Sequence, residues 1–170
     1  MNKLNLGSGK DYREGWVNAD AFHSKADVKM DFNKKFPFKD NAFDKILMIH
    51  SLEHSKDVTF TIEECIRVLK NGGVLKIIVP HSSKHSAMTC LDHWQEFDSG
   101  SFSYFYPEMV CNYMTKGNLE LERVWFTNVN AWKLSGLAGL LANKYPKWWE
   151  RWASKLFEIH EIEYILKVVK

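Results

Sequence analysis

A short glycine turn and two aspartates near the N-terminus are the residue types that a nucleoside-binding site needs. Gly7-Ser8-Gly9 follows the apolar segment Lys3–Leu6, and glycine lets a backbone approach a ligand closely. Asp20 ends the next apolar segment, where a carboxylate can accept hydrogen bonds from both hydroxyls of a ribose. Asp31 ends a third segment, where a polar group can reach the exocyclic amine of a base. A glycine turn followed by two acids therefore predicts a nucleoside-shaped site.

Two nucleoside cofactors compete for such a site. A dinucleotide site has the pattern G-x-G-x-x-G/A, with an acid about 20 residues further on. Tyr12 stands where the third small residue would be, and Asp20 comes 11 residues after Gly9, which leaves no room for a pyrophosphate-capping helix. The spacing disfavours NAD. The other alternative, a plain strand-to-loop turn at Gly7-Ser8-Gly9, stays open at this point.

The segments that would position these residues alternate between strands and connectors of helix length. Residues 57–70 carry apolar side chains at the i, i+3, i+4, i+7 spacing of an amphipathic helix. We expect Asn71-Gly72-Gly73 to end that helix, with a glycine in a left-handed cap. Strands are predicted at Lys3–Leu6, Trp16–Ala19, Val28–Met30, Phe43–Ile49, Val74–Val79, Leu119–Thr127 and Glu161–Val169.

This alternation predicts an α/β fold with a mostly parallel sheet, to which the last two strands add as a pair. In such a sheet, ligands bind outside the carboxyl ends of the strands, where the glycine turn, both aspartates and His50-Ser51 fall. Residues 81–118 are rich in histidine and aromatic side chains with weak periodicity. We expect them to form a loop and a short helix over the sheet.

Composition limits the class of protein. The chain has 170 residues, of which 45% are hydrophobic and 26% charged, so it can bury a core and is expected to form a single domain over residues 1–170. A net charge of +2 is too small to predict a nucleic-acid partner. No run of about 18 apolar residues predicts a membrane span. Three dispersed cysteines and an N-terminus without signal-peptide features predict a cytoplasmic protein.

Five segments resemble the class I S-adenosylmethionine-dependent methyltransferases, and are most similar to their small methyltransferase type 11-like group. These segments are KLNLGSG, GWVNAD, DVKMDFN, FPFKDNAFDKILMIHSLEH and IRVLKNGGVLKIIVP. The resemblance covers residues 3–80 and implies a Rossmann-like, doubly wound sheet of seven strands whose last strand runs antiparallel. It also implies S-adenosyl-L-methionine as cofactor and S-adenosyl-L-homocysteine as product.

The resemblance implies roles for residues at the strand ends. Gly7 and Gly9 would lie under the methionine part of the cofactor, Asp20 would hold the ribose, and Asp31-Phe32 would flank the adenine. Many members have an acid in place of Asn5 and a third glycine after Gly9. The full set of implied cofactor-binding residues is Asn5, Leu6, Gly7, Ser8, Gly9, Asp20, Ala21, Asp31, Phe32, His50, Ser51 and His54.

His93 is the candidate catalytic residue, because it matches a histidine that related sequences carry after an aspartate, here Asp92. It would act as a general base or orient the acceptor. The alternative is a structural histidine that fixes the loop. No metal site is predicted, because no zinc template matches the spacing of His81, His85, Cys90, Asp92 and His93.

Residues 132–158 combine tryptophans with basic side chains. A helix through residues 144–157 would place Lys144, Lys147, Arg151 and Lys155 on one side and Trp149, Trp152 and Leu156 on the other. Pro146 suits the first turn of that helix. One interpretation is a lid whose tryptophans pack on the sheet. The other is a helix that contacts a membrane peripherally and brings the enzyme to a lipid-linked acceptor.

Together these patterns predict a methyltransferase that acts on a small-molecule, sugar or lipid-linked acceptor. Residues 1–80 would bind the cofactor, and residues 81–118 and 132–158 would face the acceptor. The alternative is a non-catalytic, methyltransferase-like scaffold or partner subunit that keeps the nucleoside pocket. A nicotinamide oxidoreductase is a more distant third. The sequence does not define the oligomeric state.

Overall fold

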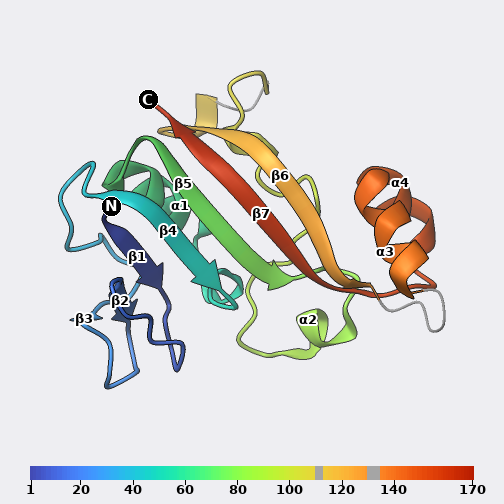
Figure 1. Ribbon diagram of the computed structural model, residues 1–170, viewed down its shortest axis with the longest axis horizontal. Helices are drawn as coiled ribbons and strands as arrows, with labels where there is room; N and C mark the ends of the chain where they lie inside the picture. Colours follow the sequence, from blue (N-terminus) through green and yellow to red (C-terminus); the bar gives the residue numbers. More distant parts are fainter. Residues whose placement is uncertain (110–112, 130–134) are drawn as a thin grey trace.

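A seven-stranded mixed sheet organises the protein, as a computed structural model of residues 1–109, 113–129 and 135–170 shows (Figure 1). The strand order is β3-β2-β1-β4-β5-β7-β6. The first five strands in chain order pair in parallel, and β7 is antiparallel to both of its neighbours, which confirms the predicted α/β, doubly wound fold. The strands are β1 Lys3–Leu6, β2 Val17–Asp20, β3 Val28–Lys29, β4 Phe43–Ile49, β5 Leu69–Pro80, β6 Asn118–Val129 and β7 Ile159–Val169.

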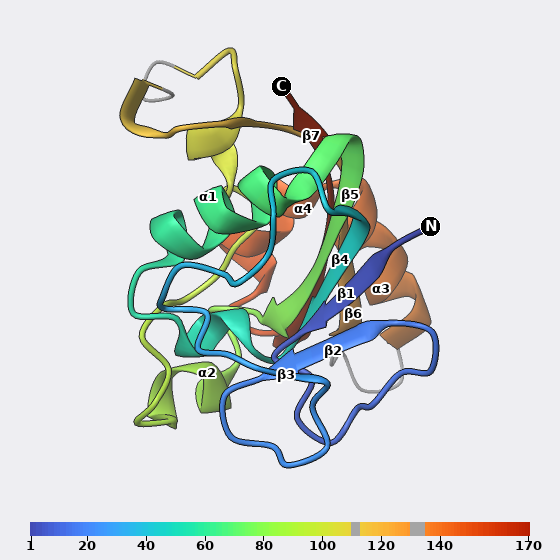
Figure 2. The same ribbon diagram turned by 90° about the vertical axis from the view of Figure 1, so that its left-hand side faces the viewer.

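Helices are distributed unevenly over the chain. Residues 7–16 and 21–27, all of them described, join β1 to β2 and β2 to β3 without a helix. Figure 2 shows α1 and α2 on one side of the sheet and α3 on the other. The helical segments are η1 Leu52–His54, α1 Val58–Val68, α2 His85–Thr89, η2 Ser103–Phe105, α3 Ser135–Lys144, α4 Pro146–Trp148 and the π-helical η5 Trp149–Ala153.

Helix α1 begins where the sequence predicts but ends earlier. The Asp57 carboxylate caps it by accepting a hydrogen bond from the Phe60 N–H at 2.9 Å. The predicted end at residue 70 with a glycine cap is wrong, since the buried Leu69 is already extended and starts β5 beside Phe43. Gly72 is left-handed, with φ of 72°, but lies within β5.

The core lies between the sheet and the segments that cover one of its faces. Alternate residues of β7 point into it, and Tyr164 is fully buried with its ring edge-on to Phe102 at 4.6 Å. The intervening residues face the other side of the sheet. There Glu163 binds Lys76 at 2.7 Å and Arg123 at 2.6 Å. This alternation is the period-two pattern of a strand with one face in the core, and the strand predicted at Glu161–Val169 is confirmed.

The predicted helix over residues 144–157 is confirmed only from Pro146 to Ala153, where α4 continues into η5. Helix α3 ends at Lys144, and Tyr145 has φ of −133° before α4 begins at Pro146. A proline disfavours helical geometry in the residue before it, which explains the break. Pro146 does occupy the first turn of α4, as expected. Trp132 and Lys133, which the sequence analysis included in this segment, lie outside the described residues.

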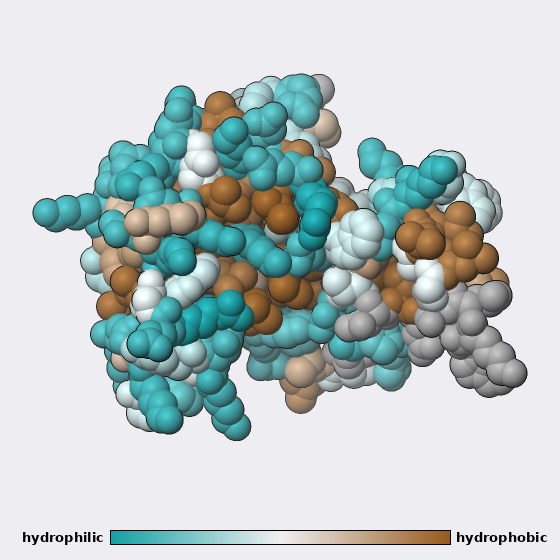
Figure 3. Space-filling model, viewed as in Figure 1, coloured by the Kyte–Doolittle hydropathy of each residue, from teal (hydrophilic) through white to brown (hydrophobic). Residues whose placement is uncertain are grey.

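The tryptophans of this segment do not share one environment. Trp149 is 4% exposed and packs beside Phe157, with ring centroids 5.8 Å apart. Trp148 is 57% exposed and Trp152 is 61% exposed, so the interpretation of a lid that packs its tryptophans on the sheet is wrong for these two. Figure 3 shows apolar surface where α3 and α4 lie in Figure 1. Among the described residues, no helix has both the length and the apolarity to cross a bilayer.

Candidate cofactor and acceptor site

The glycine turn folds back onto the end of β2. The N–H groups of Gly7 and Ser8 both donate to the Ala19 carbonyl, at 2.8 and 3.1 Å. Gly7 has φ of 70°, and a Cβ added there would lie 2.4 Å from the Cβ of Ser51. Gly9 is also left-handed, with φ of 49°, but no described atom lies within 4 Å of its Cβ position. Neighbouring side chains therefore fill the space beside Gly7, whereas the space beside Gly9 is open. The open backbone at Gly9 leaves room for the methionine part of the cofactor.

Asp20 fixes this turn and remains ionised. One carboxylate oxygen accepts from the Gly9 N–H at 2.8 Å, and the other accepts from the N–H groups of Phe22 and His23, both at 2.8 Å. Partial burial raises the pKa of Asp20, but hydrogen bonds from His23, Phe22 and Gly9 outweigh it and hold the pKa below its ordinary value. An ionised carboxylate accepts about four hydrogen bonds, of which these three are in use, so Asp20 keeps capacity for about one more, such as one from a ribose hydroxyl.

Asn5 and Leu6 support the turn from below. Asn5 is 2% exposed, and its amide N–H groups donate to the Asp11 carbonyl at 2.6 Å and to the Asn18 side-chain oxygen at 3.1 Å. Leu6 belongs to the buried core. Both residues therefore shape the site from inside the protein, because their side chains are buried and contact other protein groups.

The ends of β3 and β4 meet beside the glycine turn. The hydroxyl of the buried Ser51 donates to the Leu6 carbonyl at 3.2 Å, and the Phe32 ring approaches the Cβ position of Gly7 to 3.7 Å. Asp31 accepts from the backbone and side-chain N–H groups of Asn33 at 2.9 and 3.0 Å. The backbone bond is the main reason that the pKa of Asp31 is lowered. The fold thus places the predicted residues that follow β1, β2, β3 and β4 at one edge of the sheet. Ser8 lies in the loop after β1, and Ala21 lies in the loop after β2.

His50 turns from the end of β4 toward β7. Its backbone is left-handed, with φ of 47°, an uncommon conformation for a residue other than glycine. Its ring lies 3.1 Å from Glu161 and 3.6 Å from Glu53. The hydrogen bond with Glu53 is the largest cause of a raised His50 pKa, and burial opposes it.

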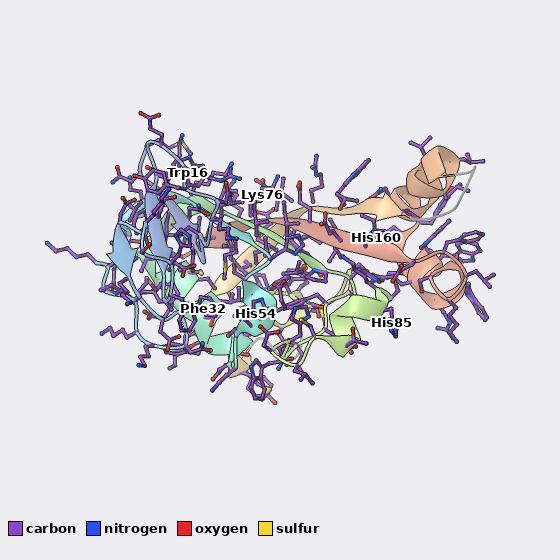
Figure 4. All side chains as sticks on the ribbon, turned by 90° about the horizontal axis from the view of Figure 1, so that it is seen from below. Trp16, Phe32, His54, Lys76, His85 and His160 are labelled. Carbon is purple, nitrogen blue, oxygen red and sulfur yellow. The ribbon has the colours of Figure 1, made fainter. Side chains whose placement is uncertain are left out.

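His93 lies next to His54, although the sequence separates them widely. Their ring centroids are 5.0 Å apart, and Nδ1 of His54 is 3.1 Å from both the carbonyl and a carboxylate oxygen of Asp92. Nδ1 of His93 is 3.1 Å from the Ala87 carbonyl. Figure 4 shows His54 on the same side of the sheet as Phe32, with His85 farther along. The segment after β5 thus brings His93 to the predicted cofactor edge.

A set of hydrogen-bonded polar side chains connects residues 81–118 with residues 132–158, the two segments expected to face the acceptor. His81 is 2% exposed, and its Nδ1 accepts from the Ser83 N–H, so its Nε2 donates to Glu150 at 3.0 Å. Glu150 also accepts from the backbone and hydroxyl of Ser99, at 2.7 and 2.5 Å. His81, Ser83 and Glu150 line a groove with Ser82 and Asp98. Sequence reasoning missed Glu150, since no local motif marks it.

Comparisons with known proteins agree with this geometry. Residues 9–77 match the family model described as a methyltransferase domain. No curated protein matches the chain. A solved S-adenosylmethionine-dependent methyltransferase from Archaeoglobus fulgidus is 14% identical with a TM-score of 0.65, over 98% of this chain and 86% of that one. A second, from Aquifex aeolicus, is 15% identical with a TM-score of 0.58, over 99% and 82%.

The two kinds of match cover different parts of the chain. The solved structures align with nearly the whole chain, including the region of β7. At such low sequence identity, this likeness shows a shared fold and nothing more. The family model covers residues 9–77, which include Gly9, Asp20 and Phe32. Residues 9–77 therefore match a methyltransferase domain, and the whole chain has the fold of solved S-adenosylmethionine-dependent methyltransferases.

Proposed function

We propose that the protein transfers a methyl group from S-adenosyl-L-methionine to a small-molecule, sugar or lipid-linked acceptor. The observation that carries the proposal is the convergence of the glycine turn, Asp20, Phe32 and Ser51 at one sheet edge, with His93 beside them. In this proposal residues 1–170 form one methyltransferase domain, residues 1–80 bind the cofactor, and residues 81–118 and 132–158 face the acceptor.

Each group has a role that follows from its position. When bound, S-adenosylmethionine supplies an electrophilic methyl group. The backbone around Gly9 would cradle its methionine part, the Asp20 carboxylate would accept from the ribose hydroxyls, and Asp31 and Phe32 would flank the adenine. Holding the acceptor in line with the methyl group is the main task left to the protein, and such alignment contributes about 7–11 kcal/mol in favourable cases.

His93 is the proposed acceptor-side residue. Its Nδ1 lies 3.1 Å from the Ala87 carbonyl, an acceptor only, so the proton is on Nδ1 and Nε2 is left to orient an acceptor or take its proton. A general base contributes about 10²–10⁴-fold to a rate. His93→Ala should lower turnover by that order while the cofactor still binds. Unchanged turnover would remove His93 from the mechanism.

Thermal unfolding with and without ligands tests the cofactor assignment. S-adenosylmethionine or S-adenosylhomocysteine at 100 times its dissociation constant should add about 2.7 kcal/mol to the free energy of unfolding. For a chain of this length, that raises the midpoint by roughly 5–10 °C. NAD should give no shift. Asp20→Ala should abolish the shift, whereas Asp11→Ala, an exposed acid in the neighbouring loop, should keep it.

The opposite result would favour the alternative function. If neither S-adenosyl compound shifts the midpoint of the folded wild-type chain at millimolar concentration, the chain does not bind cofactor alone. The non-catalytic scaffold or partner subunit would then be the better proposal, and a partner captured with the full chain would support it.

The surface of α3 and α4 favours a lipid-linked acceptor among the three classes. Leu137, Leu140 and Trp148 are 57%, 66% and 57% exposed, and such a cluster of large apolar side chains marks an interaction surface. Exposed basic residues accompany them, at Lys144, Lys147, Arg151 and Lys155. We propose that residues 144–157 contact an anionic membrane peripherally, because an apolar surface bordered by basic residues binds at lipid interfaces.

Vesicle sedimentation tests this contact. The chain should pellet with anionic vesicles at low salt and remain in solution with zwitterionic ones. Trp148→Ser combined with Trp152→Ser should release it, whereas Trp94→Ser, a tryptophan 57% exposed in the loop after α2, should not. Failure to bind anionic vesicles would restrict the acceptor to water-soluble molecules and leave the methyltransferase proposal intact.

A further inference from the structure

Three potential metal ligands converge beside the cofactor edge. Glu53, His54 and His93 each place one ligand atom within 4.8 Å of the other two. Glu53 and His54 come from η1 after β4, and His93 comes from the loop after α2. A backbone hydrogen bond of 2.8 Å from the Trp94 N–H to the Glu53 carbonyl joins the two segments.

The hydrogen bonds of the two imidazoles direct their free nitrogens. Nδ1 of His54 faces two oxygens of Asp92, and Nδ1 of His93 faces the Ala87 carbonyl. Carbonyl and carboxylate oxygens only accept, so both neutral rings carry their proton on Nδ1 and a lone pair on Nε2. A ring nitrogen that donates to a carboxylate or a backbone carbonyl is the usual outer partner of a metal-binding histidine.

Glu53 is the independent observation that points to a cation. The residue is 2% exposed, and its Oε2 is buried with no hydrogen-bond partner among the described residues. Its other carboxylate oxygen lies 3.6 Å from the His50 ring, which is charged only when protonated. Among the described residues, His50 is the only recorded ion-pair partner of Glu53. A buried carboxylate oxygen without a partner is costly. A cation among the three groups would remove this cost.

We propose that Glu53, His54 and His93 form a site for a divalent transition-metal ion, with zinc as the ion that the ligands suit. Two histidines and one glutamate with an open fourth position are a known set for catalytic zinc. Asp92 would orient His54 from the outer shell. Cys90 and Asp92 form a second, separate group of potential ligands with His93. The sequence could not show this site, because its two parts come from separate segments with no template spacing.

One consequence rests on the proposed methyl transfer, although metal binding itself does not. An acceptor oxygen in the open position would lose its proton more easily, since a bound metal lowers the pKa of an oxygen ligand. His93 would then orient the acceptor through the metal, in agreement with the second of its two proposed roles.

Metal titration of the full chain tests the proposal without any methyl donor. After removal of metal with EDTA, the chain should bind one equivalent of Co²⁺ with a visible absorption band, and Zn²⁺ should displace it. Glu53→Gln, His54→Ala and His93→Ala should each weaken binding by more than about 100-fold, and Asp92→Asn by about 10–100-fold. His85→Ala, an exposed histidine outside the cluster, should bind like the wild type.

A nearly isosteric variant guards against loss of folding. Metal-free Glu53→Gln should unfold at or above the wild-type temperature, because it loses a buried charge and keeps its shape. The proposal is overturned if the folded wild type binds neither ion, or if Glu53→Gln and His93→Ala bind both ions unchanged. A chain that binds zinc but shows no shift with S-adenosyl compounds would contradict only the proposed function.

Discussion

The two ends of the sheet hold their strands in different ways. Strands β1, β2 and β3 have four, four and two residues, and loops without helices join them. Strands β5, β6 and β7 have 12, 12 and 11 residues, and β7 pairs antiparallel with both β5 and β6. Short strands offer few main-chain hydrogen bonds, so side chains must hold the loops of the first region.

Asn18 and Asp20 illustrate this difference. Asn18 is fully buried and bonds the backbone of Arg13 and Trp16 and the carboxylate of Asp27, while Asp20 accepts from three backbone N–H groups. In the opposite region, main-chain hydrogen bonds between the long strands hold the sheet together. Side chains there form ion pairs, such as that of Glu163 with Lys76. A cofactor site built from loops therefore depends on individual polar side chains, each of which can be removed to test the comparison.

The largest expected effect is that of Gly7→Ala in the short-strand region. A left-handed alanine costs about 1–2 kcal/mol, and the overlap with Ser51 adds about 1–3 kcal/mol. Urea unfolding should therefore show a loss of about 3 kcal/mol, together with loss of the S-adenosylmethionine shift. Gly9→Ala is the matched control, since it has open space and should lose only about 1 kcal/mol. Equal losses in the two variants would contradict the close packing at Gly7.

A smaller loss of stability is expected when either of two asparagines is replaced. Asn18 lies on β2 in the short-strand region, and Asn143 lies on α3, bonded to β6 of the long-strand region. Asn18→Ala should cost about 2–3 kcal/mol, because it leaves several buried backbone groups without partners. Asn143→Ala should cost about 1 kcal/mol. Although Asn143 bonds both backbone groups of Phe126, that strand keeps its ladder with β7. Denaturant midpoints of the two variants measure the difference, and a larger loss for Asn143→Ala would break the comparison.

The smallest effect concerns acid and salt. Burial raises the pKa of Glu163, but Lys76 and Arg123 outweigh it, so the pKa lies below its ordinary 4.5. A lowered pKa means that the stability from Glu163 is present above pH 4.5 and is lost as the pH falls through the folded-state value. Thermal midpoints of Glu163→Gln should therefore fall less steeply below that pH than those of the wild type. High salt should reduce the difference between the two chains, because it screens ion pairs. A difference that salt leaves unchanged would show that these ion pairs are not its source.

Much of the fold could be predicted, and the errors have local causes. The bounds of β1 and β4 agree with the apolar runs, because a buried strand needs consecutive apolar residues. The glycine cap after α1 was wrong because pairing of Leu69 with Phe43 overrides the local preference of Gly72. The helix predicted over residues 144–157 begins only at Pro146, because a proline disfavours helical geometry in the preceding Tyr145.

The sequence by itself determined which segments form strands and which polar residues stand at their ends, because the chain carries hydrophobic period and turn chemistry locally. Only the tertiary structure decided which distant side chains meet, as His54 meets His93 and His81 meets Glu150. It also decided that Trp149 is buried while Trp148 and Trp152 are exposed. These outcomes depend on how separate segments pack against one sheet, and packing across such sequence distances leaves no periodic signal in either segment.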